Sequence, residues 1–177
     1  MLDSIRYKIL FKQYKNKVYN YALFILKDDM DADDVTQEVL IRIWKNMGQF
    51  NLNAAKVWIM KTTHNLCLDY LRRRKKFDDR KYKIDTDKEI NLVDMTPSNY
   101  PDYRVNFINV DEKIKKAIEK LPEVLNSIFV LYEVQGFKYK EISNILNIPL
   151  NNVKVYLLRA RRKLQEELKD YEKEKVY

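Results

Sequence analysis

The sequence predicts an all-α protein made of two small helical domains joined by a long flexible linker. Only 2 of its 177 residues are glycine, which argues against phosphate-binding loops, dinucleotide-binding turns and hairpin-rich β folds, because these need backbone at positive φ. Apolar residues recur every three or four positions in residues 1–76 and 111–177, as one face of a helix requires. Residues 77–110 lose this period, contain Pro97 and Pro101 and carry a net charge of −2, so we interpret them as an acidic linker.

The overall composition favours an anionic partner and argues against a membrane or metal protein. The formal net charge of +8 suits nucleic acid or a membrane surface, because clustered Lys and Arg release counterions condensed on phosphates. The apolar run Ala22–Leu26 is far shorter than the roughly 20 residues that a membrane span needs. One cysteine, Cys67, excludes an intramolecular disulfide and disfavours a structural zinc site. We therefore expect a cytoplasmic protein with no membrane insertion, metal or cofactor.

The first two predicted helices each carry one apolar stripe. In the first, the stripe consists of Ile9, Leu10, Tyr14, Val18, Tyr21, Ala22 and Ile25. The second begins within an acid-rich segment, which suits the positive end of a helix dipole. Its apolar row is Val35, Val39, Ile43 and Met47, and Gly48 ends it.

Another side of the second helix forms what we call the acidic face. Its members are spaced at i, i+3, i+4 and i+7: Asp34, Gln37, Glu38 and Ile41. From Asp28 to Glu38 there are six acids and no base. On charge alone this pattern is typical of a solvated helix surface, and the alternative is a docking surface for a basic partner.

A third helix is expected from about residue 54 to 76, and it mixes hydrogen-bonding and basic side chains. They are Lys61, His64, Asn65, Asp69, Arg72 and Arg73. Such a set suits contact with phosphates and bases, although cations at a helix C-terminus are favoured by the dipole in any protein. His64 lacks partners for general-base or metal chemistry. Cys67, between two leucines, is expected to be a small buried apolar residue.

The C-terminal zone predicts a helix-turn-helix. Leu121 and Pro122 open a helix that Gly136 ends, and a short second helix is followed by a turn at residues 147–149. The third helix has an inner row of Val153, Leu157, Ala160 and Leu164. Its outward residues suit contact with bases and phosphates in the major groove: Asn151, Asn152, Lys154, Val155, Tyr156 and Arg159. A purely structural helical hairpin would not need this segregation of charge.

Taken in order, these motifs resemble bacterial extracytoplasmic-function (ECF) sigma factors of the sigma-70 family. Asp31–Lys45 is similar to their polymerase-binding region 2.2, and Val57–Arg73 to their region 2.3 to 2.4 helix. Four segments are similar to region 4 of these proteins: Leu121–Glu123, Gly136–Ile142, Val153–Lys154 and Leu158–Leu164. The resemblance implies region 2 over residues 1–76, the linker over 77–110 and region 4 over 111–177.

The resemblance also implies partners and roles. The acidic face would bind the β′ clamp helices of RNA polymerase core, and region 4 would meet the β flap. Promoter minus-10 DNA would be contacted by Asn51, Lys61, His64, Asn65, Asp69, Arg72 and Arg73. Residues 49–53 would capture a flipped base and help melt the duplex. Minus-35 DNA would be contacted by Asn151, Asn152, Lys154, Tyr156, Arg159 and Arg162. An anti-sigma factor is a further implied partner.

The resulting hypothesis is a dissociable initiation subunit that catalyses no bond chemistry. A stand-alone helix-turn-helix regulator is the alternative, and it would bind operator DNA tightly by itself. An enzyme that processes nucleic acid is a third class, but the sequence has no clustered metal ligands, no His pair and no phosphate loop.

Overall fold

The computed structural model describes residues 1–49, 51–84 and 111–174, and within these ranges it contains helices and no strand. The prediction of an all-α fold is therefore confirmed. The N-terminal elements are α1 (Leu2–Leu26), α2 (Asp29–Lys45), the 3-10 turn η1 (Met47–Gln49) and α3 (Leu52–Ile84). The C-terminal elements are α4 (Glu112–Glu119), α5 (Glu123–Phe129), the π-helical turn η3 (Val130–Val134), α6 (Tyr139–Leu146) and α7 (Leu150–Glu174).

A tight turn joins α1 to α2 and lets the two helices pack against each other. Lys27 ends α1 in the left-handed region, with φ at 55°, and its N–H donates to the carbonyl of Leu23 over 2.8 Å. The Asp28 carboxylate then accepts the N–H of Asp31 over 2.9 Å, which caps α2. This turn brings the apolar rows of the two helices together.

The predicted rows are buried except at Ile9, which is exposed, and Tyr14, which is half-buried. Val35, Val39 and Ile43 of α2 and Met47 of η1 are buried, as predicted, although α2 ends at Lys45 and not at Gly48. In α1, Leu10, Val18, Tyr21, Ala22 and Ile25 are buried, but Ile9 is 47% exposed, so including it in the stripe was wrong. Successive residues differ by about 100° around a helix, and Leu10 takes the inward position.

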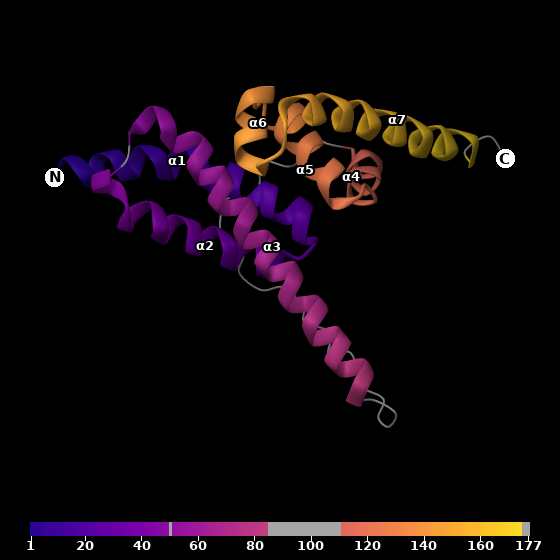
Figure 1. Cartoon of the computed structure of the whole chain (residues 1–177), viewed down its shortest axis with the longest axis horizontal. Helices are drawn as coiled ribbons and strands as arrows, with labels where there is room; N and C mark the ends of the chain where they lie inside the picture. Colours follow the sequence, from indigo (N-terminus) through magenta and orange to yellow (C-terminus); the bar gives the residue numbers. More distant parts are fainter. Residues whose placement is uncertain (50, 85–110, 175–177) are drawn as a thin grey trace.

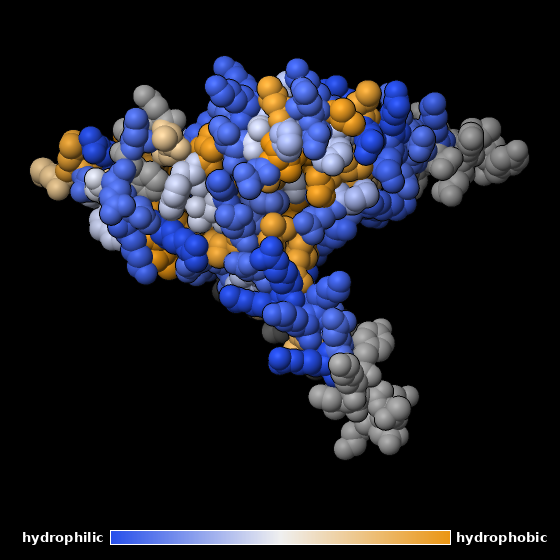
Figure 2. Space-filling view, viewed as in Figure 1, coloured by the Kyte–Doolittle hydropathy of each residue, from blue (hydrophilic) through white to orange (hydrophobic). Residues whose placement is uncertain are grey.

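Helix α3 is longer than the sequence predicted. It runs to Ile84 and its C-terminal half projects away from the rest of the molecule (Figure 1). Residues 77–84, assigned to the linker, contain neither Gly nor Pro, so nothing in them breaks the helix. Where Figure 2 colours this projecting part, its surface is mostly hydrophilic. The rest of the predicted linker, 85–110, lies outside the described residues.

The C-terminal helices form the predicted helix-turn-helix, preceded by a helix that we did not predict separately, α4. Gly136 has a φ of 72°, and Asn147, at 54°, turns the chain between α6 and α7. The inner row of Val153, Leu157, Ala160 and Leu164 is buried, as predicted. Pro122 stands one position before α5 rather than within its first turn.

The two halves pack against each other, with α1 against α4 and α5, and α3 against α6. Their relative placement was left open by the sequence. Buried apolar side chains from both halves form one continuous cluster. Among the described residues, no helix has the length and apolar character needed to cross a bilayer.

Loss of the α2 cap should weaken the fold. Asp28→Ala removes the acceptor for the Asp31 N–H, so the free energy of unfolding should fall by about 1 kcal/mol. Urea unfolding followed by circular dichroism measures it. Asp34→Ala, an exposed position on the same helix, serves as the control, and an equal loss in that variant would argue against a capping effect.

Candidate functional site

A groove between α2 and α3 gathers residues from two predicted sites. All four members of the acidic face line it, together with Arg42, Leu66, Asp69, Tyr70 and Arg73, around a volume of about 430 Å³. The sequence assigned Asp69 and Arg73 to a separate DNA-contacting set. In the fold, these two residues share one groove with Asp34 and Glu38.

The groove combines charge with an exposed apolar side chain. Glu38 accepts from Arg42 Nε over 2.7 Å, and Gln37 donates to Asp33 over 3.1 Å. Ile41 is 47% exposed. An apolar contact flanked by charges of both signs is suited to binding a protein rather than to chemistry on a small molecule.

Three groove residues were missed by the functional interpretation of the sequence: Arg42 on α2, and Leu66 and Tyr70 on α3. With Asp69 and Arg73, the two α3 residues are spaced at i, i+3, i+4 and i+7, the same signal that identified the acidic face of α2. The Arg73 guanidinium lies 5.8 Å from the centre of the Tyr70 ring. The spacing could therefore have identified both sides of the groove.

Most of the other predicted minus-10 residues lie on the exposed side of α3. Lys61, Asn65, Asp69 and Arg72 are all exposed, and Asp69 accepts from Arg72 over 3.2 Å. Asn51 is exposed just before α3, and its carbonyl accepts the N–H groups of Ala54 and Ala55. These side chains form a polar surface over several turns.

His64 is not on that surface. It is only 9% exposed, and its Nδ1 lies 2.9 Å from the hydroxyl of the buried Tyr21. The prediction that His64 contacts DNA is therefore corrected, because the side chain faces α1 in the core. Burial lowers its pKa to about 4, so the imidazole is neutral at pH 7.

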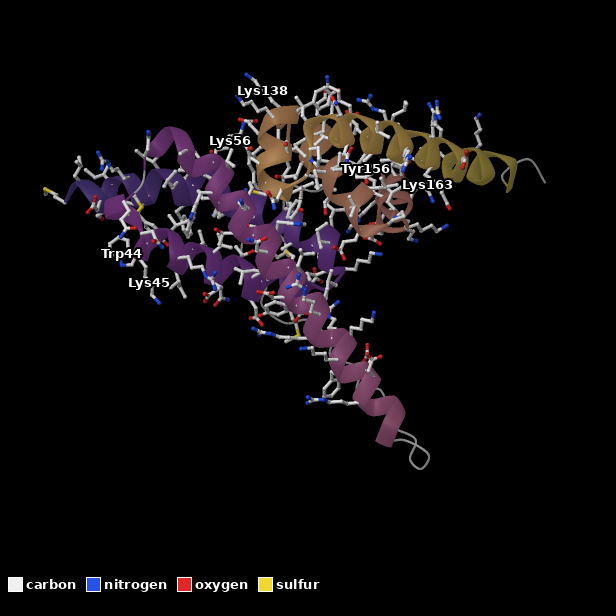
Figure 3. The ribbon with its side chains drawn as sticks, viewed as in Figure 1. Trp44, Lys45, Lys56, Lys138, Tyr156 and Lys163 are labelled. Carbon is white, nitrogen blue, oxygen red and sulfur yellow. The ribbon has the colours of Figure 1, made fainter. Side chains whose placement is uncertain are left out.

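Helix α7 presents an exposed basic surface opposite its buried row. Asn151, Asn152, Lys154, Arg159 and Arg162 are exposed. Tyr156 differs, because it is half-buried and lines a groove of about 580 Å³ with Val124, Leu125 and Ile148, rimmed by Arg159, Arg162, Lys163 and Glu166. Figure 3 shows Tyr156 and Lys163 on this helix.

A stacked pair of tyrosines beside α7 holds two of its cations. The rings of Tyr132 and Tyr139 lie 4.8 Å apart at an interplanar angle of 9°. Lys154 lies 5.9 Å from the Tyr139 ring, and Arg161 5.6 Å from the Tyr132 ring. Arg161 also donates to Glu133 over 2.7 Å. These contacts restrict both side chains, and the sequence did not suggest them.

The described residues provide no group of His, Cys, Asp or Glu side chains arranged to hold a metal ion. Cys67 is fully buried, as predicted, and burial raises the pKa of its thiol.

The buried imidazole makes a pH-dependent prediction. The unfolded chain takes up a proton below about pH 6.5 and the folded chain only near pH 4, so stability falls as the pH drops through this window. Between pH 7 and pH 5 the contribution of His64 should be about 2 kcal/mol. Urea unfolding at both pH values measures the loss of unfolding free energy between pH 7 and pH 5. In His64→Gln this loss should be smaller than in the wild type by that amount. A wild-type loss no larger than that of the variant would contradict the prediction.

Comparison with known proteins identifies both halves of the chain. The family models Sigma-70 region 2 and Sigma-70, region 4 match residues 10–77 and 111–164, which together make up more than half of the chain. The ECF RNA polymerase sigma factor SigM of Bacillus subtilis is 28% identical over 156 residues, 88% of this chain and 91% of that protein. SigW of the same organism is 27% identical over 89% of this chain and 86% of its own length.

Solved structures agree with the fold. The sigma factor RpoE of Bartonella quintana, crystallised with the anti-sigma factor NepR, has a TM-score of 0.70 at 22% identity over 93% of this chain and 97% of its own. CnrH, in complex with the cytosolic domain of CnrY, has a TM-score of 0.63 at 17% identity over 93% and 88%. With both region models matched in order, the chain belongs to the sigma-70 family and is a sigma factor of the ECF type, a protein that directs RNA polymerase in the initiation of transcription.

Proposed function

We propose that the chain binds RNA polymerase core through the acidic face, directs it to promoters with two DNA elements and helps open the duplex. One observation carries the proposal: the acidic face lies in the groove on α2, whereas exposed cations and amides lie on α7 and on the part of α3 outside the groove, at Lys61, Asn65 and Arg72. A protein that engages a protein partner and two stretches of DNA at once needs such a division.

The acidic face is the proposed contact for the β′ clamp helices. Asp34 and Gln37 are exposed, and Ile41 offers an apolar contact beside them. A basic helix laid along the groove would pair with Asp34 and Glu38 while covering Ile41. Leu66 and Tyr70, on the opposite wall of the groove, are added to this surface.

The exposed surface of α3 is the proposed minus-10 reader. It comprises Lys61, Asn65, Asp69, Arg72 and Arg73, with Asn51 before the helix; His64 is left out because it is buried. The proposed base-capturing segment, residues 49–53, includes position 50, which lies outside the described residues. Capture of an unstacked base beside α3 would favour strand opening.

The exposed side of α7 is the proposed minus-35 reader. The amides of Asn151 and Asn152 suit adenine, and the guanidinium of Arg159 suits guanine. Lys154 and Arg162 supply charge for phosphates. The apolar groove between α5 and α7 is the proposed contact for the β flap, with Tyr156 forming part of it.

A regulatory partner and a cellular location complete the proposal. RpoE and CnrH were each solved with a bound protein, and we propose that an anti-sigma factor likewise covers the polymerase-binding surface of this chain. We also propose that the protein acts in the cytoplasm and catalyses no reaction, because RNA synthesis is the chemistry of the polymerase.

Reconstitution tests the proposal. Purified chain and bacterial core polymerase should form a complex on gel filtration and give run-off transcripts from promoters induced when the chain is overproduced. Tight operator binding by the chain alone, with no core binding, would instead support a stand-alone regulator.

Charge reversal on the acidic face should weaken core binding. Asp34→Lys places a cation opposite the proposed basic partner, and we expect a loss of about tenfold or more in affinity for core. Pull-down with purified core measures it, and circular dichroism monitors folding. Asp3→Lys, an exposed acid on α1, is the matched control. Normal core binding by Asp34→Lys would mean that the acidic face is misplaced.

In the holoenzyme, we expect two cations of α7 to act differently: Arg159 should contact a base and Lys154 a phosphate. Arg159→Ala should cost about tenfold in affinity for the upstream element and relax preference at one base pair. Lys154→Ala should weaken all sequences evenly and reduce the slope of log affinity against log salt by about one. Electrophoretic mobility shifts at several salt concentrations measure both, with Lys12→Ala on α1 as control. Identical sequence preference and salt slope in all three variants would refute the assignment.

A further inference from the structure

Helix α1 exposes an apolar stripe on the side that faces away from the core. Leu2, Ile5 and Ile9 are 62%, 55% and 47% exposed, and their spacing of i, i+3 and i+7 places them on one face of the helix. On the opposite face, Tyr7 packs edge-on against Trp44 of α2, with the ring centres 5.1 Å apart. Figure 2 shows hydrophobic side chains at the end of the molecule where Figure 1 places the N-terminus. The fold therefore holds α1 from one side and presents the stripe to solvent on the other.

The packing of α1 does not account for this stripe. Helices α2 and α3 cover the buried side of α1, and aliphatic side chains left in water on the other side are unfavourable. The stripe ends after Ile9, because the next residues in the same register, Gln13 and Asn16, are polar. It is a local feature of the first turns of α1, and a partner that covers it would bury apolar surface.

Cations border the stripe on both sides. Successive residues are about 100° apart around a helix. Arg6, which follows Ile5, therefore lies on one side of the stripe, and Lys8, which precedes Ile9, lies on the other. Residues 2–17 contain five Lys and Arg side chains and one acid, Asp3. An apolar stripe bordered by cations is the pattern of a helix that lies in the interface of an anionic membrane.

The shape and chemistry of this face distinguish among anionic partners. Nucleic acid would pair with Arg6 and Lys8, but aliphatic side chains neither stack on bases nor hydrogen-bond to them. A second copy of the chain would bring two groups of cations together, which is unfavourable. A helix of another protein binds best in a groove, whereas this stripe is the convex outer side of one helix. A lipid surface suits a convex stripe, because headgroups and acyl chains fill in around it.

We propose that the outer face of α1 docks the protein on the surface of a bilayer that contains anionic phospholipid. Leu2, Ile5 and Ile9 enter the layer between headgroups and acyl chains, while Arg6 and Lys8 pair with the phosphates of the headgroups. The contact involves one surface of the membrane and requires no helix that crosses it. The inference goes beyond the proposed function and does not rest on it.

Sedimentation with lipid vesicles tests the proposal on the full chain. One set of vesicles contains phosphatidylcholine and phosphatidylglycerol in equal parts, and the other contains phosphatidylcholine alone. Ile5→Gln and Ile9→Gln each remove an apolar contact without changing the charge, and Gln favours a helix at least as well as Ile does. Leu158→Gln is the matched control, because Leu158, on α7, is 49% exposed. Circular dichroism checks that each variant is folded.

A second pair of variants separates local charge from net charge. Lys8→Gln and Lys169→Gln each remove one positive charge from an exposed position on a helix, but only Lys8 borders the stripe. Adsorption through net charge alone would weaken binding by both variants equally. Docking through α1 would weaken binding by Lys8→Gln alone.

The wild-type chain should bind the mixed vesicles and should bind phosphatidylcholine alone about tenfold more weakly. Ile5→Gln and Ile9→Gln should each lower partitioning onto the mixed vesicles about tenfold, and Lys8→Gln about fivefold. Leu158→Gln and Lys169→Gln should bind as the wild type does.

Three results would overturn the proposal. They are no binding of the wild type to the mixed vesicles, stripe variants that bind as well as the wild type, and an equal loss in Lys8→Gln and Lys169→Gln. The first would leave a protein partner as the ligand of this face. The assay contains neither polymerase nor DNA, so its result is independent of the run-off test of the proposed function.

Discussion

The groove and the polar surface of α3 both depend on how α3 is buried. Ile59, Thr63 and Cys67 follow one another at four-residue steps and are fully buried, and the Thr63 hydroxyl donates to the Ile59 carbonyl within the same helix. Because a helix has a fixed 3.6-residue period, burying this row fixes the direction of every other side chain. Lys61, Asn65 and Arg72 therefore point to solvent, and Leu66, Asp69 and Tyr70 face α2. Burial of this one row of α3 therefore positions both the groove and the polar surface.

The net charge of the chain does not describe any one of its surfaces, because the charges are distributed unequally among them. A net charge of +8 indicates an anionic partner, but it is the sum of an acidic α2, a mixed groove and a basic α7. Within the fold, several charges are already paired: Asp31 with Arg74, Glu133 with Arg161, and Glu141 with Lys56. The unequal distribution lets one small protein present opposite signs to different partners.

Periodicity predicted the elements well because it reports which residues share a helix face. It identified the buried rows of α2 and α7, the acidic face and the turn before α7. Periodicity could not say what covers a helix face. His64 lies at the edge between the exposed side of α3 and its buried row. It was therefore assigned to the exposed surface, although it is buried. The hydroxyl of Tyr21, which is 43 residues away in sequence, provides its hydrogen bond. The end of α3 was missed because a loss of apolar period does not end a helix.

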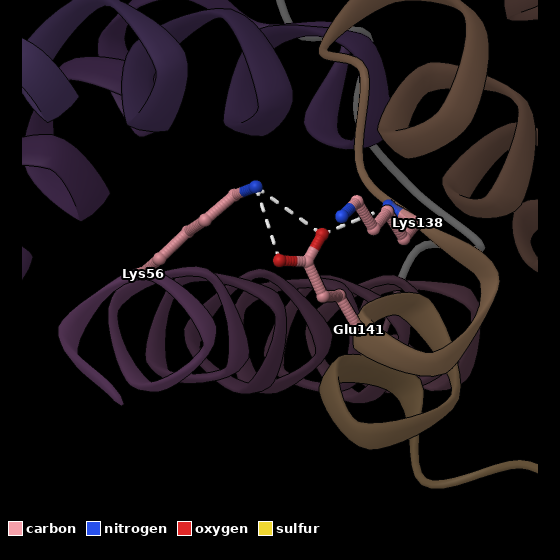
Figure 4. A network of polar contacts seen from close by, with 3 residues as sticks. All are labelled: Lys56, Lys138 and Glu141. Carbon is pink, nitrogen blue, oxygen red and sulfur yellow. Dashed lines mark hydrogen bonds and ion pairs between the residues drawn. The ribbon is translucent and has the colours of Figure 1, made fainter. Parts of the chain in front are cut away.

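The contact between the two halves could not be predicted from periodicity either, because its hydrogen bonds join residues 85 to 118 positions apart in the sequence, among them Lys56 and Glu141 (Figure 4). Its composition nevertheless explains its character. Phe137 is covered as completely as a core residue, yet the bonds around it come from lysines and amides whose other polar atoms would gain partners in water. The same contact joins buried apolar side chains of both halves into one cluster, while the side-chain oxygens of Asn126 and Gln135 find no partner among the described residues. The contact therefore combines apolar burial, which stabilises it, with buried unpaired acceptors, which cost free energy.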